Sequence, residues 1–291
     1  MRISDVTSTY TISSRLMNIK SEEAQITEEL LTGRKINSLQ DDAAVGNSLL
    51  LSQAERERLV QYNSNSTLSN SIAQSGIDAL KHIGEVNELA LSIAESSTED
   101  DSTTAVKNID SLIEDVLATA NTKFGDEYIF AGTASASDTA PFTYDEIKGQ
   151  YIHNGTAEGR SIEVSDGISV SPFTGSEGTQ AILDTLNSLV ALRDAVADND
   201  KDEIAAQSAA LESADDAVLE ASSDLGMVQY RLEIMDTRNA AKYSAYDKAE
   251  SNATAADENE STVNLLATQN AYSAALQTAA KILDMSLLDY I

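Results

Sequence analysis

The 291-residue sequence contains no cysteine, no tryptophan and only two prolines. Without cysteine, the chain can form neither a disulfide framework nor a thiolate metal site. Aromatic residues make up 5% of the chain, and all four phenylalanines and both prolines fall between residues 124 and 173. The sequence on either side of that stretch therefore has no proline to interrupt long helices.

Positive charge is also scarce, because 19 lysines and arginines face 48 aspartates and glutamates, giving a net charge of −29. This balance argues against nucleic acid as a partner and disfavours anionic membrane surfaces. It also opposes close packing between copies of the chain, unless the charge lies away from their contacts or is screened by salt.

Long apolar runs are missing as well. The opening MRISDVTSTYTISSRL has no apolar core of a secretory signal peptide, so none is predicted there. Residues 261–280 are free of charge, but nine of these twenty residues are Ser, Thr, Asn or Gln. Bilayer hydrocarbon penalises such side chains, so this segment is predicted to be a helix buried among other helices, with no membrane partner.

Helical spacing of apolar residues dominates both ends of the chain. Residues 9–30 carry one stripe, interrupted only by Glu23, and Gly33 is predicted to end this helix. Asp41 and Asp42 suit the start of a second helix reaching residue 96, and a third follows the polar run 96–104. Further helices are predicted from about residue 179 to the break at 197–201, and then towards residue 255.

The C-terminal segment carries a second stripe. Leu265, Leu276 and Leu287 are eleven residues apart, and Tyr272 and Leu283 share that step. Eleven residues make about three full helical turns, so this stripe is predicted to run straight along the helix or to wind slightly to the right. A seam with a heptad repeat would wind to the left.

The middle of the chain has a different pattern. Residues 125–178 hold eight of the thirteen glycines, and residues 161–164 and 167–170 alternate between polar and apolar. Such period-two alternation predicts half-buried strands, so a small β-rich insert is expected between the helical parts.

Catalytic signals are weak. His82 and His153, the only histidines, lie in different parts of the chain and in no metal-binding motif. The glycines of GTAEG, residues 155–159, are not followed by the lysine of a phosphate-binding loop. We therefore expect no enzyme activity, no cofactor and no metal.

Three segments resemble the bacterial flagellin superfamily. TGRKINSLQDDAA, residues 32–44, is similar to the segment that follows the first helix throughout that superfamily. DEYIFAGTASASDTAPF, residues 126–142, and the C-terminus from NLLATQNAYSAALQ to SLLDYI, residues 264–291, resemble the hook-associated protein 3 family, which joins hook to filament. Ala43 departs from the proline common in that family and is flagellin-like, so the filament protein flagellin remains the alternative.

The resemblance implies a mainly α fold with three parts. Terminal helices, residues 1–40 and 256–291, would form a D0 pair. Residues 41–131 and 179–255 would form a D1 bundle of long helices, and residues 132–178 a small β-rich D2 insert.

The same resemblance implies a structural subunit of the hook–filament junction, secreted through the flagellar type III export apparatus and located in the extracellular flagellum. Its expected partners are other copies of itself, another hook-associated junction protein, flagellin and an export chaperone. The subunit interface is expected on the two terminal stripes, at Ile12, Leu16, Ile19, Ile26, Leu30, Leu265, Tyr272, Leu276, Leu283, Leu287 and Leu288.

Isolated helices are marginal in water, so the terminal segments are expected to be largely disordered in the monomer and to fold on docking. A helical ligand-binding or sensor module is the alternative from another class. It would need an export signal or a membrane anchor, and the sequence predicts neither.

Overall fold

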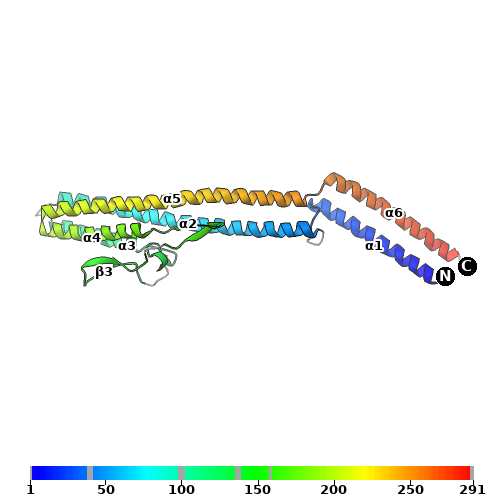
Figure 1. Ribbon diagram of the computed structural model, residues 1–291, viewed down its shortest axis with the longest axis horizontal. Helices are drawn as coiled ribbons and strands as arrows, with labels where there is room; N and C mark the ends of the chain where they lie inside the picture. The colour runs from blue at the N-terminus through cyan, green and yellow to red at the C-terminus, as the bar shows by residue number, and fades with distance from the viewer. Residues whose placement is uncertain (1, 38–41, 98–101, 135–138, 157–158, 289–291) are drawn as a thin grey trace. The chain divides into compact units, whose positions relative to one another are not determined.

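The computed structural model describes residues 2–37, 42–97, 102–134, 139–156 and 159–288; for 2–6, 8, 9 and 282–288 it describes the backbone alone. Long helices make up most of these residues, which confirms the predicted mainly α class (Figure 1). The helices are α1 (Arg2–Thr32), α2 (Ala43–Ser96), α3 (Ser102–Ala120), α4 (Ser176–Asp198), α5 (Lys201–Thr254) and α6 (Glu258–Leu288). The chain divides into two compact units, residues 1–57 with 242–291 and residues 58–241, and α2 and α5 contribute to both.

Aspartate side chains begin three of these helices. Asp42 Oδ1 accepts hydrogen bonds from the backbone N–H groups of residues 44 and 45, at 2.9 and 3.1 Å. Asp200 does the same at the start of α5 and Asp257 at the start of α6. A carboxylate at this position satisfies free N–H groups and complements the helix dipole, so the sequence itself sets these boundaries. Asp41, also predicted at the start of α2, lies outside the described residues.

Residues with positive φ end two helices. Gly33, with φ of 67°, follows α1, as the sequence predicted, and Asn199, with φ of 52°, follows α4. Glycine and asparagine tolerate this left-handed conformation better than other residues.

In the first unit, the two connections between helices are joined to each other. Lys35 N–H donates to the Thr254 carbonyl at 2.7 Å, and Ala256 N–H donates to the Gly33 carbonyl at 3.0 Å. Arg34 contacts Glu250 at 3.3 Å, and Arg56 contacts both Glu250 and Asp247. These bonds hold the end of α5 against the start of α2.

In the second unit, α2, α3, α4 and α5 enclose the main hydrophobic core. Its fully buried side chains are less than 2% exposed and include Leu80, Ile83, Ile109, Val116, Ile182, Leu186, Leu189, Leu192 and Leu211. The apolar residues of α5 recur at helical spacing; Leu211, Val218, Leu225 and Leu232 are buried, whereas Val228 and Met235 are half-buried. The helical periodicity of the sequence therefore located this core correctly.

The described residues form three two-stranded antiparallel sheets, one just before the predicted insert and two within it. They pair β1 (Lys123–Phe124) with β2 (Glu127–Tyr128), β3 (Phe142–Asp145) with β4 (Gln150–His153), and β5 (Ile162–Ser165) with β6 (Ile168–Val170). The last pair confirms the strands predicted from the alternating pattern. Side chains of Phe142, Tyr151 and Phe173 belong to the same hydrophobic cluster as the helices, whereas Val164 and Val170 pack with Leu232 of α5.

Asparagines on the helices, or directly after one in the case of Asn121, bind the backbones of these short strands. Asn121 both donates to the Phe142 carbonyl and accepts from its N–H, each at 3.0 Å. Asn187 makes the same pair of bonds to Tyr151, at 2.8 and 3.4 Å. Asn239 donates to the Val164 carbonyl at 2.8 Å and accepts from the Ser165 hydroxyl at 3.0 Å. The amide side chains thus satisfy backbone groups that a two-stranded sheet leaves unpaired.

The sequence GDEYIFAGT, residues 125–133, connects the helices to the strands through closely packed backbone. Gly125, with φ of 64°, lies in the turn between β1 and β2. Ile129 and Phe130, which directly follow β2, are buried in the core. The Phe130 carbonyl accepts a hydrogen bond from His153 Nε2 at 2.9 Å. A Cβ on Gly155 would lie 2.6 Å from the Ala131 carbonyl oxygen, so this close approach requires glycine.

Candidate assembly interface

The terminal helices α1 and α6 lie side by side in the first unit (Figure 1). On α1, one row of side chains that are at least half-buried recurs at alternating steps of four and three residues: Ile12, Leu16, Ile19, Glu23, Ile26 and Leu30. On α6, the same steps connect Ser261, Leu265, Thr268, Tyr272, Ala275 and Ala279. This spacing is that of a coiled-coil seam, and it brings seven of the predicted interface residues into one row between the helices.

Polar contacts cross the seam at three levels. The Ser261 hydroxyl donates to Glu29 Oε2 at 3.2 Å. Gln269 Nε2 donates to Glu23 Oε1 at 3.3 Å, and Lys20 Nζ lies 5.8 Å from the centre of the Tyr272 ring. Residue numbers fall on α1 as they rise on α6, so the two helices are antiparallel. Glu23, which interrupts the stripe in the sequence, therefore has a partner across the seam.

The buried row on α6 differs from the predicted eleven-residue step. Leu265 and Tyr272 lie on the seam, but Leu276 lies one position past it and is 44% exposed. A single facing helix selects side chains every 3.5 residues on average, whereas the eleven-residue step follows a straighter path around the helix. The side chains of Leu283, Leu287 and Leu288 lie outside the described part of the structure.

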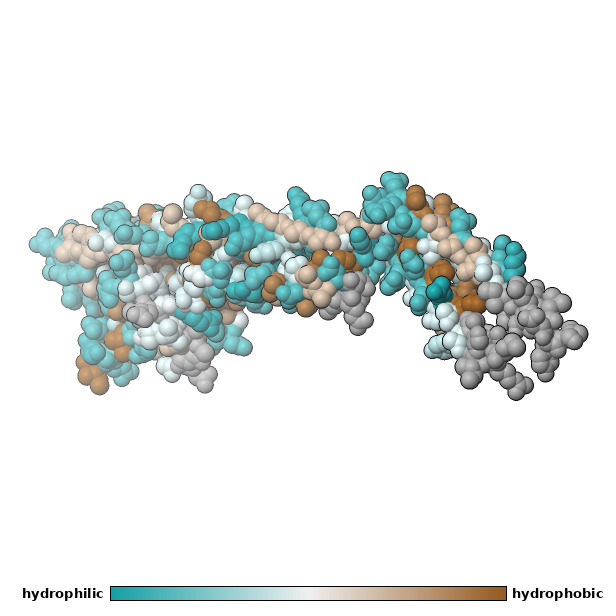
Figure 2. Space-filling view, turned by 45° about the vertical axis from the view of Figure 1, so that its right-hand side comes forward, coloured by the Kyte–Doolittle hydropathy of each residue, from teal (hydrophilic) through white to brown (hydrophobic). Residues whose placement is uncertain are grey.

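Large apolar side chains remain exposed on both terminal helices. On α1, Tyr10 is 77% exposed, Met17 70% and Leu31 82%; on α6, Val263 is 65% exposed and Leu266 57%. Brown apolar side chains interrupt the hydrophilic surface of this helix pair in Figure 2. Two helices cover only one face of each other, so this apolar surface is available to further partners.

A groove of about 720 Å³ separates the helices near the start of α6. Its apolar lining includes Ile19, Ile26, Ala267 and Ala271. Its charged lining consists of Glu22, Glu29, Asp257 and Glu260 with a single cation among the described residues, Lys35. The groove is therefore acidic, and a basic side chain would be the complementary occupant.

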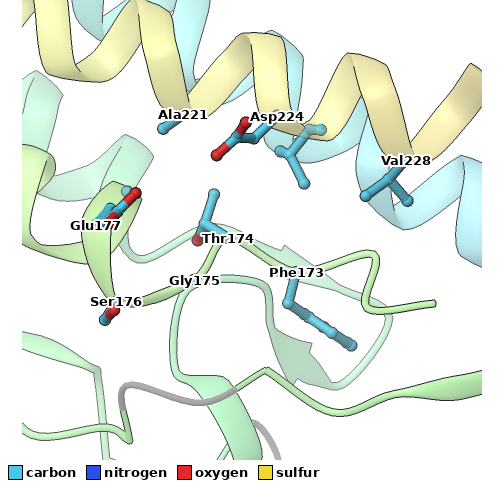
Figure 3. A pocket seen from close by; sticks show the side chains of 10 residues that line it. Phe173, Thr174, Gly175, Ser176, Glu177, Ala221, Asp224 and Val228 are labelled. Carbon is cyan, nitrogen blue, oxygen red and sulfur yellow. The ribbon is translucent and has the colours of Figure 1, made fainter. Parts of the chain in front are cut away.

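A smaller pocket of about 240 Å³ lies at the N-terminus of α4, against α5 (Figure 3). Glu177 and Asp224 contribute carboxylates and Phe173 and Val228 contribute apolar surface, but no histidine, lysine or arginine of the described chain lines it. The Thr174 hydroxyl is buried and has no hydrogen-bond partner among the described residues. These groups do not constitute a nucleophile with a neighbouring base.

The histidines lie in separate environments. His82 contacts Asp115 at 3.0 Å on the surface between α2 and α3, whereas His153 lies on β4. Burial lowers the pKa of His153, against the opposing effect of its hydrogen bond to the Phe130 carbonyl. Among the described residues, no group of three or more His, Asp and Glu side chains is arranged to hold a metal ion. No described helix is long and apolar enough to cross a membrane.

Comparison with solved structures identifies proteins of the same fold. A protein from Vibrio parahaemolyticus that is assigned as a flagellar hook-associated protein is 21% identical, with a TM-score of 0.66 over 74% of this chain and 100% of that one. FlgL of Bacillus cereus is 18% identical, with a TM-score of 0.54 over 70% of this chain and 100% of its own. FlgL of Xanthomonas campestris is 12% identical, with a TM-score of 0.53 over 67% of this chain and 98% of its own. At these identities the likeness establishes the fold.

Comparison with protein families adds a match at the level of sequence, although no curated protein matches the chain. The matching family is the bacterial flagellin N-terminal helical region, and the match spans residues 3–135. This range contains α1 from residue 3 onwards, α2, α3 and the YIFAG sequence. The predicted resemblance to the flagellin superfamily is thus confirmed, because residues 3–135 match the bacterial flagellin N-terminal helical region.

Proposed function

We propose that this protein is a structural, non-enzymatic subunit of the bacterial flagellum that forms the hook–filament junction by polymerising through α1 and α6. The observation that carries the proposal is the antiparallel α1–α6 pair, which leaves large apolar side chains exposed beside a half-buried seam. The flagellin N-terminal family match and the fold shared with hook-associated proteins support it.

The mechanism is assembly coupled to folding. Within one chain, most seam residues are only half-buried, so the pair gains little from the burial of apolar surface, at about 25 cal/mol per Å². That gain has to offset roughly 1–2 kcal/mol of backbone entropy for each ordered residue. Neighbouring subunits would cover Met17, Val263, Leu266 and Leu276 and supply the missing burial.

The proposed interface consists of the predicted residues of both stripes. Some of them hold α1 against α6, and others contact a neighbouring copy. Seam residues such as Ile26 and Tyr272 hold the pair together, and Leu276 contacts a neighbouring copy. Boundaries near residues 40 and 256 would separate this D0 pair from the D1 helices, with residues 132–178 as the D2 insert.

The proposed partners are other copies of the chain, a second hook-associated protein and flagellin. Secretion by the flagellar type III export apparatus, with an export chaperone, would deliver the protein to the extracellular flagellum. Flagellin itself is the second candidate, because Ala43, the first residue of α2, replaces the proline common in the junction family.

Substitution of Leu276 tests this function. Leu276→Asp should leave the monomer folded, because the side chain lies outside the seam and is 44% exposed. In the polymer, we expect the carboxylate to be buried without a partner, at a cost of several kcal/mol in each subunit. Cells that lack the native protein should therefore regain attached filaments with the native gene but not with Leu276→Asp.

The matched control is Gln277→Glu, which adds the same charge one residue further along α6 at an exposed polar position. Restoration of filaments by Leu276→Asp to the level of the control would refute the proposed terminal contact.

A further inference from the structure

An apolar face runs along the outside of α5 in the second unit. Leu219 is 65% exposed, Met227 58%, Tyr230 57% and Ile234 43%. With Ser223 they form one row at steps of three and four residues on the same helix. No charged residue lies within this row, which we call the α5 outer face, although Asp216 precedes it and Glu220 and Glu233 flank it.

The buried row of α5 lies on the opposite side of the helix. It consists of Val218, Ala221, Leu225 and Leu232, each at most 6% exposed. The α5 outer face is therefore turned away from the core, and no described part of this unit covers it. Exposed apolar surface of this extent is typical of protein–protein contacts.

Residues 59–77 of α2 form a second unusual surface. These nineteen residues include no charged side chain, although 23% of the whole chain is charged. Their outward side chains include Val60, 59% exposed, and Leu68, 43% exposed, with Ser64 and Thr67 between them. We call this surface the α2 neutral segment.

Hydroxyl groups on both surfaces are already hydrogen-bonded within their own helices. Thr67 donates to the carbonyl of residue 63 at 2.9 Å, and Ser71 donates to that of residue 67 at 3.0 Å. On α5, Ser223 donates to the carbonyl of residue 219 at 3.0 Å. Burying these three hydroxyls against a partner therefore leaves none of them as an unpaired donor, which keeps the desolvation cost low.

We propose that the α5 outer face of one copy docks on the α2 neutral segment of a second copy. This proposal depends on one part of the proposed function, namely that copies of the chain assemble with each other. Each copy carries a net charge of −29, so close contact favours surfaces with few acidic residues, such as the uncharged α2 neutral segment. The large side chains of the α5 outer face supply the ridge, and the small ones between Val60 and Leu68 supply the groove.

This contact joins two different surfaces, so each copy offers one of each to its neighbours. Such a heterologous contact repeats from copy to copy and builds a ring or an open helical assembly, whereas a self-complementary contact would close into a dimer. The contact is therefore of the kind that a tubular polymer requires.

Cysteine cross-linking tests which surfaces meet, and the native chain has no cysteine to interfere. Tyr230→Cys and Leu68→Cys are made in separate copies and expressed together in cells that lack the native protein. A short bismaleimide should link the two variants to each other. The matched control replaces Leu68→Cys by Leu89→Cys, since Leu89 is 51% exposed on the same helix but lies beside Glu85 and Glu88.

A second measurement uses purified protein at high concentration in 1 M salt, where the screening length falls to about 3 Å. Tyr230→Glu should raise the concentration needed for assembly about tenfold or more, because it places a charge in an apolar contact. Leu89→Glu, which adds the same charge outside the contact, should leave that concentration unchanged.

The outcomes separate the two proposals. If filaments are restored but the yield of the Tyr230–Leu68 cross-link does not exceed that of the Leu89 control, this contact is refuted and the proposed function is not. Equal assembly by Tyr230→Glu and Leu89→Glu would also overturn it. A native protein that assembles under no condition, and restores no filaments, would overturn both.

Discussion

At the scale of single residues, His153 connects the YIFAG sequence to the strands. Its Nε2 donates to the Phe130 carbonyl at 2.9 Å, and its ring packs on Phe142 with 4.9 Å between the ring centres. Burial lowers the pKa of His153 in the folded protein, so folding favours the neutral ring. The sequence pattern predicted no role for this histidine, because its partner is a backbone carbonyl 23 residues away.

A pH dependence follows from this lowered pKa. The unfolded chain takes up the proton first as the pH falls below the usual histidine value of about 6.5, so stability is lost on acidification through that value and down to the folded pKa. The melting temperature of the native protein should therefore fall more between pH 7 and pH 5 than that of His153→Gln, which does not titrate. Because the ring is only half-buried, we expect this difference in melting temperature to be small.

Calorimetry of both proteins across this pH range measures that difference. The carboxylates common to the two proteins cancel in the comparison, so parallel curves would contradict the assigned role of His153.

At the scale of elements, the short strands depend on the helices that carry their asparagine partners. Two-stranded sheets of three or four residues are not stable in water by themselves. Asn121, Asn187 and Asn239 satisfy strand backbones, while Phe142 and Tyr151 share the hydrophobic cluster of the helices. The strands are therefore attached to the bundle by both hydrogen bonds and apolar contacts.

Removal of one asparagine measures this attachment. Asn121→Ala would leave the N–H and the carbonyl of the buried Phe142 without these partners, and each unsatisfied buried group costs about 1–3 kcal/mol. We expect the free energy of unfolding, measured in urea, to fall by about 2–3 kcal/mol. Asn70→Ala, at an exposed position of α2, should change it by less than about 0.5 kcal/mol. Equal effects of the two substitutions would show that the backbone bonds to Asn121 contribute little.

At the scale of the whole molecule, the two units differ in how well they are buried. The unit of residues 58–241 contains the fully buried core, whereas the α1–α6 seam consists mostly of half-buried side chains. Its exposed apolar residues would be covered in the proposed polymer. The terminal helices should therefore be the least stable part of a free monomer.

Limited proteolysis of the monomer tests this difference. A protease should remove about the first 35–40 and the last 35 residues and spare the middle, because poorly protected terminal backbone is cut first. Mass spectrometry of the fragments, with light scattering to verify the monomer, gives the measurement. Termini as resistant as the middle in a verified monomer would contradict folding on assembly.

Several boundaries were predictable because their cause is local. Gly33 ends α1, Asp42 begins α2, and the break at residues 197–201 separates α4 from α5. The alternating pattern also located β5 and β6. The partners across the chain were not predictable, since Asn121 lies 21 residues from Phe142 and Glu23 lies 246 residues from Gln269.

The sequence by itself determined the helical class, the positions of most helix ends and the apolar rows, because caps, periodicity and glycine act over a few neighbouring residues. Only the tertiary structure decided which of those apolar residues face another helix of the same chain. It placed Tyr272 on the α1–α6 seam and left Leu276 exposed beside it, because the direction of the facing helix, and not the sequence spacing alone, selects the buried side chains.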